Sequence, residues 1–204
     1  GVAKSARSYM KDPIKIVSKE KSLTVARVAQ SWIKVEPWDK KHMLHHLLTH
    51  ETPALTVVFC RTKRTVDDVT RYLNRKKIDA YAIHGDMIQS QRNKVMERLR
   101  GGNLGVLVAS DLAARGLDVD GISHVINYDL PEDPEVYIHR IGRTARAGRN
   151  GVAWSLVAPF QGELLTNCEM LANIEIPQQE YADFKPGPIP ADIRAETELA
   201  EKRV

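Results

Sequence analysis

Short apolar runs rich in valine and isoleucine recur along this chain, and they constrain its fold more than any other feature. Each run is four to six residues long and shows little alternation between apolar and polar positions. Continuous apolar character of this kind is typical of strands that are covered on both faces, as in a parallel sheet. The runs occupy residues 56–60, 80–84, 105–109, 124–127 and 152–157.

Amphipathic stretches separate these runs and predict helices between the strands. Their apolar residues fall on one helical face in each case: Met43, Leu44, Leu47 and Leu48, then Val66, Val69 and Leu73, then Val95, Met96 and Leu99. This alternation predicts an α/β fold, a single doubly wound domain whose mainly parallel sheet has helices on both faces. Ligands of such sheets bind near the carboxyl ends of the strands, so the residues after each run are the first candidates for a site.

The 204 residues suffice for one domain with flanking segments. We expect residues 1–29 to be a linker or the end of a preceding domain, 30–173 to be the domain itself, and 174–204 to be a Pro-rich and charged extension. A further helix is expected at 163–172. Residues 185–190 cannot form a helix or a central strand, and the charged end after them is expected to be a tail or linker.

Composition narrows the class of protein only slightly. The net charge of +4 suits a partner rich in phosphate but does not require one. No apolar stretch approaches the roughly 20 residues that a membrane span needs, so we expect no membrane partner. Cys60 and Cys168 lie far apart and show no metal-binding spacing, which favours buried, reduced thiols in a cytoplasmic protein.

Two of the segments that follow apolar runs carry groups that could hold a phosphate backbone. Residues 57–63 end in Arg61, Thr62 and Lys63, which would lie at the positive N-terminal end of the next helix. In residues 84–92, Gly85 would let a ligand approach the backbone closely. Taken alone, the first segment is more simply interpreted as a capped, solvated turn, and the His-Gly-Asp of the second is common by chance.

The segment at 106–119 favours function more strongly. Its strand would deliver Ser110 and Asp111 to the edge of the sheet, and a tight turn of small residues would then present Arg115 and Asp118. Arg115 could neutralise a phosphate, and Asp118 could accept hydrogen bonds from sugar hydroxyls. A merely structural loop does not need this mixture of groups.

The most distinctive segment, residues 139–149, repeats arginine at every third position with no acidic residue among them: Arg140, Arg143, Arg146 and Arg149. Because like charges repel, we expect an anion to receive these side chains. The guanidinium fork suits phosphate oxygens, including the charge that develops on a transferred γ-phosphoryl group. A solvated basic face would normally mix lysines with acids.

In this order and spacing, the four segments resemble motifs IV, IVa, V and VI of the C-terminal RecA-like domain of DEAD-box RNA helicases, in superfamily 2. The resemblance runs from about residue 30 to residue 159, and residues 127–131 resemble the family's segment between the last two motifs. Each motif is weak alone, but the ordered set is specific. It implies a RecA-like fold and the C-terminal half of an ATP-dependent RNA helicase that separates RNA strands locally.

The resemblance also implies roles for individual residues. Asp118 would contact the ATP ribose, and Arg143 and Arg146 would act as arginine fingers on the γ-phosphate. His139 and Arg140 would link the site to motifs of the other helicase half and transmit closure. The RNA backbone would be held by Thr62, Gly85, Ser110 and Arg115.

This chain departs from the family pattern in three respects. Ser110 stands where threonine is usual, which keeps the hydroxyl but loses an ordering methyl group. Ala145 stands where glycine is commoner, which should constrain the loop and be tolerated. The chain begins with Gly1 and contains neither a G-x-x-x-x-G-K-[ST] loop nor an Asp-Glu-Ala-Asp box. We therefore expect a fragment, inactive alone, with ATP and Mg²⁺ held mainly by an absent N-terminal RecA-like domain.

Two other interpretations stay open. The chain could be the C-terminal domain of another superfamily 2 motor that acts on DNA, although the His-Gly-Asp and His-Arg-Ile-Gly-Arg-Thr segments fit such motors less well. It could also be a non-catalytic RNA-binding or assembly module. Binding that depends on the RNA 2′-hydroxyl would exclude a motor that acts on DNA. A phosphate-binding loop encoded upstream would exclude a non-catalytic module.

Three histidines at four-residue spacing, His42, His46 and His50, could in principle ligate a metal ion. They lie opposite the apolar face of their helix, and no cysteine or carboxylate nearby in the sequence completes a ligand set. The sequence therefore predicts a solvated histidine face and no metal site. Trp32 and Trp38 are expected to be packing residues at the edge of the domain.

Overall fold

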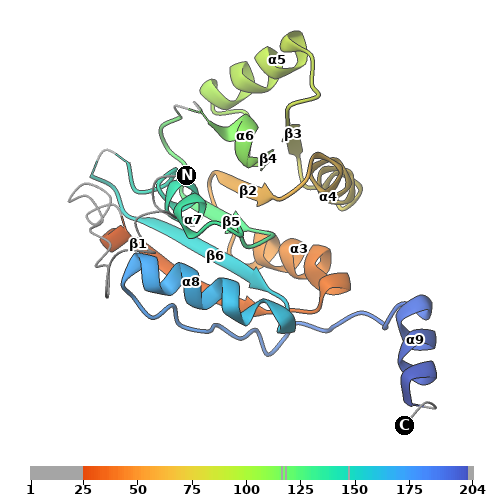
Figure 1. The fold of residues 1–204 in the computed structure, drawn as a ribbon. Coiled ribbons are helices and arrows are strands. Elements are labelled where there is room, and N and C mark those ends of the chain that lie inside the picture. Colours follow the sequence, from red (N-terminus) through yellow and green to blue (C-terminus); the bar gives the residue numbers. More distant parts are fainter. Residues whose placement is uncertain (1–24, 116, 118, 147, 202–204) are drawn as a thin grey trace, which may run out of the picture.

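A six-stranded sheet forms the centre of the molecule (Figure 1). The computed structural model describes residues 25–201 except 116, 118 and 147. The strands are ordered β1-β6-β5-β2-β4-β3, and all five pairings are parallel. Their bounds are β1 Val28–Lys34, β2 Thr56–Cys60, β3 Ala80–Ile83, β4 Val106–Ser110, β5 His124–Asn127 and β6 Gly151–Val157. The predicted α/β fold is confirmed.

The five apolar runs all form strands, but the sequence does not predict β1. Its residues VAQSWIK place Gln30 and Ser31 in the middle of the strand, which interrupts the valine and isoleucine pattern. β1 lies at the edge of the sheet and pairs with β6 along its whole length, from Val28 opposite Gly151 to Lys34 opposite Val157. Gln30 is buried and is accommodated because its Oε1 atom accepts from the Tyr137 hydroxyl at 2.6 Å, whereas Ser31 is only partly buried.

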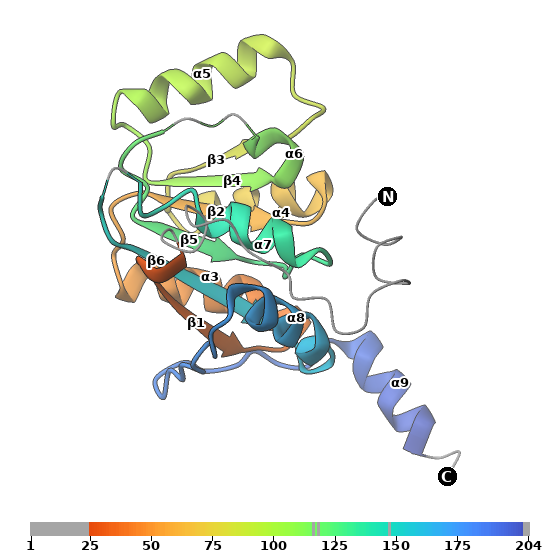
Figure 2. The same cartoon turned by 60° about the vertical axis from the view of Figure 1, so that its left-hand side comes forward.

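Helices cover both faces of the sheet (Figures 1 and 2). Helices α3 and α4 pack on one face, and α5 to α8 pack on the other. Short 3-10 turns, η1 Pro37–Asp39 and η2 Pro159–Gln161, precede α3 and α8. The helices are α3 Lys40–His50, α4 Lys63–Arg75, α5 Gln89–Arg100, α6 Asp111–Ala114, α7 Pro134–Ile141, α8 Gly162–Ala172 and α9 Ala191–Glu201.

Successive strand residues serve the two cores in turn, as the two-residue period of a strand requires. In β2, Val57 and Phe59 pack with α5 to α8, whereas Val58 and Cys60 pack with α3 and α4. All four side chains are buried. Because both faces are covered, the positions after Thr56 are all apolar, and this explains the continuous runs in the sequence.

The chain after α8 continues the packing of the domain. Residues 174–179 run along the outer side of β1, where the Trp32 N–H donates to Pro177 O at 3.0 Å and the Gln179 N–H donates to Trp32 O at 2.8 Å. Ile176 is buried in the core on the α8 side, against which Trp32 also packs, as predicted. The predicted domain ends at residue 173, whereas in the structure these contacts tie the following residues to the sheet.

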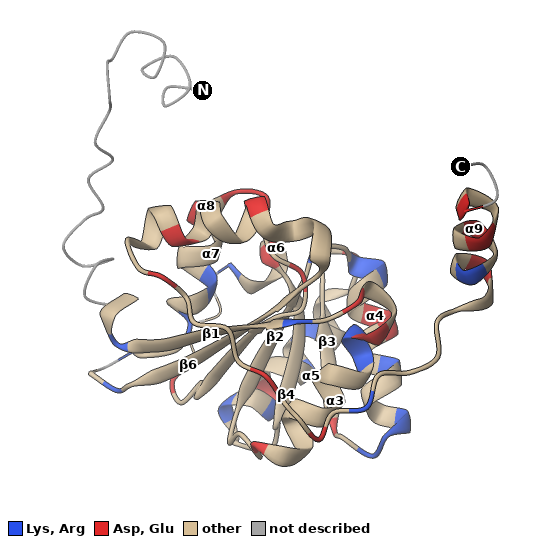
Figure 3. Ribbon diagram, turned by 90° about the horizontal axis from the view of Figure 1, so that it is seen from below, with Lys and Arg blue, Asp and Glu red and all other residues tan. Residues whose placement is uncertain are grey.

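Helix α9 lies apart from the sheet (Figure 3). None of its residues is buried, and its charge is mainly negative, with Asp192, Glu196, Glu198 and Glu201 against a single arginine. The sequence predicts a tail or linker here; the structure adds that it is helical, starting directly after Pro190, a residue favoured at helix starts. No helix within the described part of the chain combines the length and apolarity that crossing a membrane requires.

The two cysteines give a test of the core. Cys60 and Cys168 are free and buried, and burial raises the pKa of Cys60 well above its usual value and that of Cys168 to about 12. Because the thiolate is the reactive species, neither thiol should react with a disulfide reagent in the folded protein at about pH 8, whereas both should react in denaturant. Rapid reaction of one thiol per chain in the folded protein would contradict this packing.

Candidate functional site

Three of the predicted site segments lie together at the carboxyl edge of the sheet. The register pairs Cys60, the last residue of β2, with Ser110, the last residue of β4, and β3 runs beside β4 on its other side. Thr62 follows the end of β2 by two residues, and Gly85 follows the end of β3 by two residues. The residues that the resemblance assigns to RNA contacts therefore come from three neighbouring strand ends.

The first segment also starts helix α4. Thr62 is its N-cap, and the Thr62 Oγ1 atom accepts a hydrogen bond from the Thr65 N–H at 3.1 Å. The capped turn is therefore present, and it leaves the Thr62 side chain exposed at the positive end of a 13-residue helix. Lys63 Nζ forms an ion pair with the Asp86 carboxylate, which ties this segment to the His-Gly-Asp segment and lowers the pKa of Asp86.

His84 fixes the backbone of the second segment. Its Nδ1 atom accepts from the Asp86 N–H at 3.3 Å, so the hydrogen of the neutral ring lies on Nε2, 2.9 Å from Asp67 Oδ1. Arg92 Nη1 donates to the carbonyl of His84 at 3.4 Å. Gly85, between them, is exposed, and a Cβ atom at this position would meet nothing within 4 Å. The backbone at Gly85 is therefore accessible to a ligand, and the hydrogen bonds of His84 hold it in place.

The guanidinium group of Arg140 forms the buried centre of the site. Its Nε and Nη2 atoms donate to the two carboxylate oxygens of Asp111, at 2.6 and 2.8 Å. Its Nη1 atom donates to Asn127 Oδ1 at 3.2 Å and to the carbonyl of Asp129 at 2.6 Å. The group also lies 5.2 Å from the centroid of the Phe59 ring, within the range of a cation–π contact. Arg140 thus joins α7 to the ends of β2, β4 and β5.

This network changes the interpretation of the arginine run. The sequence predicts four arginines gathered for an external anion, but the anion that Arg140 binds is Asp111 of the same domain. The run also does not follow a strand: Arg140 lies within α7, and the next arginine comes two residues after the end of that helix. Only the arginines beyond α7 remain candidates for binding an external phosphate directly.

Asp129 is a second anchor that sequence reasoning missed. Its Oδ2 atom accepts from the Arg61 N–H at 2.9 Å, and its Oδ1 atom lies 3.4 Å from Lys40 Nζ, which also donates to Tyr128 O at 2.8 Å. Burial lowers the pKa of Lys40, and the charge of Asp129 opposes that shift. In the sequence, only two features could have indicated this pair: Lys40 begins an amphipathic helix, and Asp129 comes just after a buried strand.

The Arg140 network predicts a strong effect of Asp111 on stability. Asp111→Asn leaves the buried guanidinium without its counter-charge, so we expect a loss of about 3 kcal/mol, the lower end of the range for breaking a buried pair because Asp111 is partly exposed. Urea denaturation measures it. Asp68→Asn is the matched control, because Asp68 pairs with Lys41 at 2.9 Å on the surface and should cost below about 1 kcal/mol. Equal effects of the two substitutions would contradict the assigned role of Asp111.

Arg143 and Arg146 lie beyond α7 and are half-buried. Arg143 Nε donates to His139 O at 3.2 Å and Arg143 Nη1 donates to Leu117 O at 3.4 Å. Arg146 Nε donates to Gly142 O at 3.4 Å. Backbone carbonyls from two segments therefore hold the guanidinium group of Arg143 in place.

Arg143 lines two small hollows. The first, of about 70 Å³, brings Asp111 and Arg115 together with His139 and Arg143. The second, of about 140 Å³, is lined by the three arginines Arg143, Arg146 and Arg149 with no acidic residue among its lining residues. A larger hollow of about 450 Å³ lies on the other side of Arg115, with Arg92 and Arg100 in its wall.

The structure thus groups most of the predicted residues, but in two places. Arg115, His139 and Arg143 share one hollow, while Thr62, Gly85 and Ser110 lie at the carboxyl edge of the sheet. Asp118, predicted to contact the ATP ribose, lies outside the described residues.

The loop that carries Arg143 and Arg146 is locked by Thr144. This side chain is fully buried, and its hydroxyl donates to Ile122 O at 2.6 Å. Gly151 packs so closely on Thr144 that a Cβ atom there would overlap it. The next residue, Ala145, has φ +57°, in the left-handed region that favours glycine.

The conformation of Ala145 predicts the sign of a substitution. Ala145→Gly removes a Cβ atom from a left-handed position, so we expect it to stabilise the protein by about 1 kcal/mol in urea denaturation. Ala113→Gly is the matched control: Ala113 is a buried helical residue of α6, and its substitution should destabilise the protein by a similar amount. Destabilisation by Ala145→Gly would show that the backbone of Ala145 carries no strain.

The fold and the site together define a class of protein. Residues 39–148, more than half of the chain, match the family model described as "Helicase conserved C-terminal domain". The chain is therefore the conserved C-terminal domain of a helicase. It is 41% identical over 168 residues to the ATP-dependent RNA helicase CshA of Limosilactobacillus reuteri and 42% identical over 168 residues to the DEAD-box ATP-dependent RNA helicase CshA of Bacillus cereus.

Both alignments cover 82% of this chain but only 34% and 32% of the relatives, so the chain spans about a third of their length. Among solved structures, a chain of E. coli DEAD-box protein SrmB, bound to the regulator RraA, gives a TM-score of 0.74 at 35% identity, and the match covers 80% of this chain and 98% of that one. The C-terminal domain of the DEAD-box protein Dbp5 gives 0.69 at 31% identity, covering 88% and 99%. The chain belongs to the DEAD-box RNA helicases, as their C-terminal RecA-like domain.

Proposed function

We propose that this chain is the half of an ATP-dependent RNA helicase that supplies arginine fingers and RNA-backbone contacts for local unwinding of RNA duplexes. The observation that carries the proposal is the hollow in which Arg115, His139 and Arg143 meet, beside the buried Arg140–Asp111 pair. Two segments far apart in the sequence bring their cations to one place there. Such convergence suits a negatively charged ligand.

Arg143 and Arg146 are the proposed arginine fingers. Stabilising the charge that develops on a γ-phosphoryl group requires guanidinium groups that are already oriented before the reaction. The hydrogen bonds from Arg143 to His139 O and Leu117 O provide that orientation, and the Thr144 hydroxyl fixes the loop between the two arginines. Asp118 is the proposed contact for the ribose of ATP.

The proposed RNA contacts lie at the carboxyl edge of the sheet. Thr62 and Ser110 offer hydroxyl groups, Gly85 offers open backbone, and Arg115 offers charge. The hollow with Arg92 and Arg100 next to Arg115 extends this basic surface. Contacts of this kind recognise the sugar-phosphate backbone, so binding should be largely indifferent to base sequence and weaker at high salt. A structure of S. cerevisiae Dbp5 bound to RNA and ADP BeF3 aligns with 99% of this chain at 28% identity.

The chain supplies only one wall of the proposed ATP site. It contains no phosphate-binding loop and no Asp-Glu-Ala-Asp box, so ATP and Mg²⁺ would be held mainly by an N-terminal RecA-like domain of the same protein. His139 and Arg140 would couple the two halves as the cleft closes and reopens. The chain alone is then inactive. Its two free, buried cysteines support a cytoplasmic location, because disulfides are rare there.

ATP hydrolysis by the full-length protein tests the proposal. Arg143→Ala should lower RNA-stimulated turnover by roughly 10³-fold or more, because an arginine finger contributes about that much, and should leave the circular dichroism spectrum unchanged. Arg75→Ala, in an exposed arginine at the C-terminal end of α4 and outside the run, is the control and should stay near wild type. Wild-type turnover in Arg143→Ala would disprove the finger assignment, and RNA-dependent turnover by the isolated chain would disprove its inactivity.

A further inference from the structure

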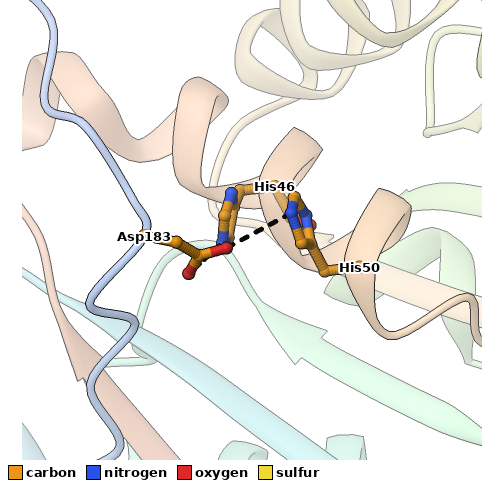
Figure 4. A group of neighbouring side chains, drawn as sticks. All are labelled: His46, His50 and Asp183. Atoms are coloured by element: carbon orange, nitrogen blue, oxygen red, sulfur yellow. Dashed lines mark hydrogen bonds and ion pairs between the residues drawn. The ribbon is translucent and has the colours of Figure 1, made fainter.

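The C-terminal extension brings a carboxylate to the histidine face of α3 (Figure 4). His46 Nε2 lies 3.3 Å from Asp183 Oδ1, and His50 Nε2 lies 3.3 Å from Asp183 Oδ2. The three donor atoms all lie within 4.8 Å of one another. Asp183 is distant from these histidines in the sequence but adjacent to two of them in the fold, so their spacing along the chain does not reveal it. His42 is not part of the cluster and pairs with Asp39 at 3.2 Å.

We propose that His46, His50 and Asp183 bind a divalent transition-metal ion, best satisfied by Zn²⁺, and that this ion fastens the C-terminal extension to α3. Two imidazole nitrogens and a carboxylate form a ligand set that suits zinc, with a remaining position for water. The proposal does not depend on the helicase function, since the cluster lies on a different part of the fold from the arginine loop.

The donor atoms lie close to the spacing that a metal ion requires, and side-chain rotation alone would close the remaining gap. Zinc binds histidine nitrogen and carboxylate oxygen at about 2.0–2.2 Å in tetrahedral geometry, which places neighbouring donor atoms about 3.3–3.5 Å apart. The two nitrogen–oxygen separations in the cluster are both 3.3 Å. The rings of His46 and His50 are stacked at 3.8 Å, and because a metal ion lies in the plane of each imidazole that binds it, one ring must turn for both to share the ion.

Hydrogen bonding leaves the correct nitrogen of His50 for the metal. The Nδ1 atom of His50 lies 2.9 Å from the carbonyl of His46, to which it donates when it carries the ring hydrogen. In that neutral tautomer, Nε2 has a lone pair directed toward Asp183. A backbone carbonyl that orients a histidine in this way is the common support of a metal ligand.

His46 supplies the second independent observation. Its Nε2 atom is buried and makes no hydrogen bond within the described part of the chain, because the 3.3 Å approach of Asp183 lacks hydrogen-bond geometry. A buried polar atom without a partner costs about 1–3 kcal/mol. A metal ion between His46 and Asp183 would satisfy it.

The surroundings hold the cluster together. Tyr181 and Phe184, on either side of Asp183, place their rings edge-on against His46 at centroid distances of 5.5 and 5.6 Å. Tyr181 Oη also donates to Glu51 Oε1 at 3.0 Å, just beyond the end of α3. The extension therefore already lies against α3 at the point where the ion would join them.

Zinc titration of the metal-stripped protein, carried on a tag without histidines, tests the site. Isothermal titration calorimetry should give one Zn²⁺ per chain for the wild type. Asp183→Asn and His50→Gln should weaken binding by at least the roughly 10- to 100-fold that loss of a ligand's supporting partner costs. His45→Gln, on the same helix but outside the cluster, is the matched control and should bind like wild type.

Two results would overturn the proposal. If the wild type takes up no zinc, the cluster is a metal-free ion pair. If Asp183→Asn binds as tightly as wild type, the extension contributes no ligand. Asp183 and His50 are exposed, so the variants should fold, and circular dichroism without metal verifies this.

Proteolysis tests the fastening separately. Chymotrypsin cleaves after aromatic residues, and Tyr181 and Phe184 flank the proposed ligand Asp183. Zinc should slow cleavage at these two positions in the wild type and should not do so in Asp183→Asn. Equal cleavage of the wild type with and without bound zinc would show that the ion does not hold the extension.

Discussion

The buried guanidinium group of Arg140 is the interaction on which the arrangement of the site depends. A charged group out of water must keep its counter-charge and fill its hydrogen-bonding positions, and Arg140 does so with groups that follow β4 and β5. These partners fix where α7 lies on the sheet. The position of α7 in turn sets where His139 and Arg143 emerge, so a side chain that does not face solvent orients the ones that do.

Much of the fold could be predicted because its signals are local. Residues 56–60 and 106–110 are covered on both faces, so their adjacent apolar residues reveal them as strands. β1 could not be found in this way, because the buried Gln30 that interrupts its apolar pattern is hydrogen-bonded to Tyr137, 107 positions away. The helix at residues 191–201 could not be predicted to differ from a tail, because it buries no side chain and therefore shows no apolar face.

The site was less predictable because its essential contacts join distant residues. Arg140 and Asp111 are 29 positions apart, and no spacing rule connects them. The same limit applies to Asp183, which reaches His46 only because the extension turns back along β1 toward α3. The arginine repeat was visible in the sequence, but only the structure separates Arg140, which binds within the domain, from the arginines beyond α7.

The course of residues 174–179 along β1 has a further consequence. An outermost strand normally offers unpaired N–H and C=O groups to any other extended chain, and proteins must block such edges to stay soluble. Here Pro177 and Gln179 take the backbone groups of Trp32, and the isolated pairing does not extend into a seventh strand. Pro177 and Gln179 face β1, and the N–H that proline lacks is the one that would have extended the pairing toward the start of β1, so the pairing stops at Trp32. A segment that looks like a loose end in the sequence thus covers part of an open sheet edge.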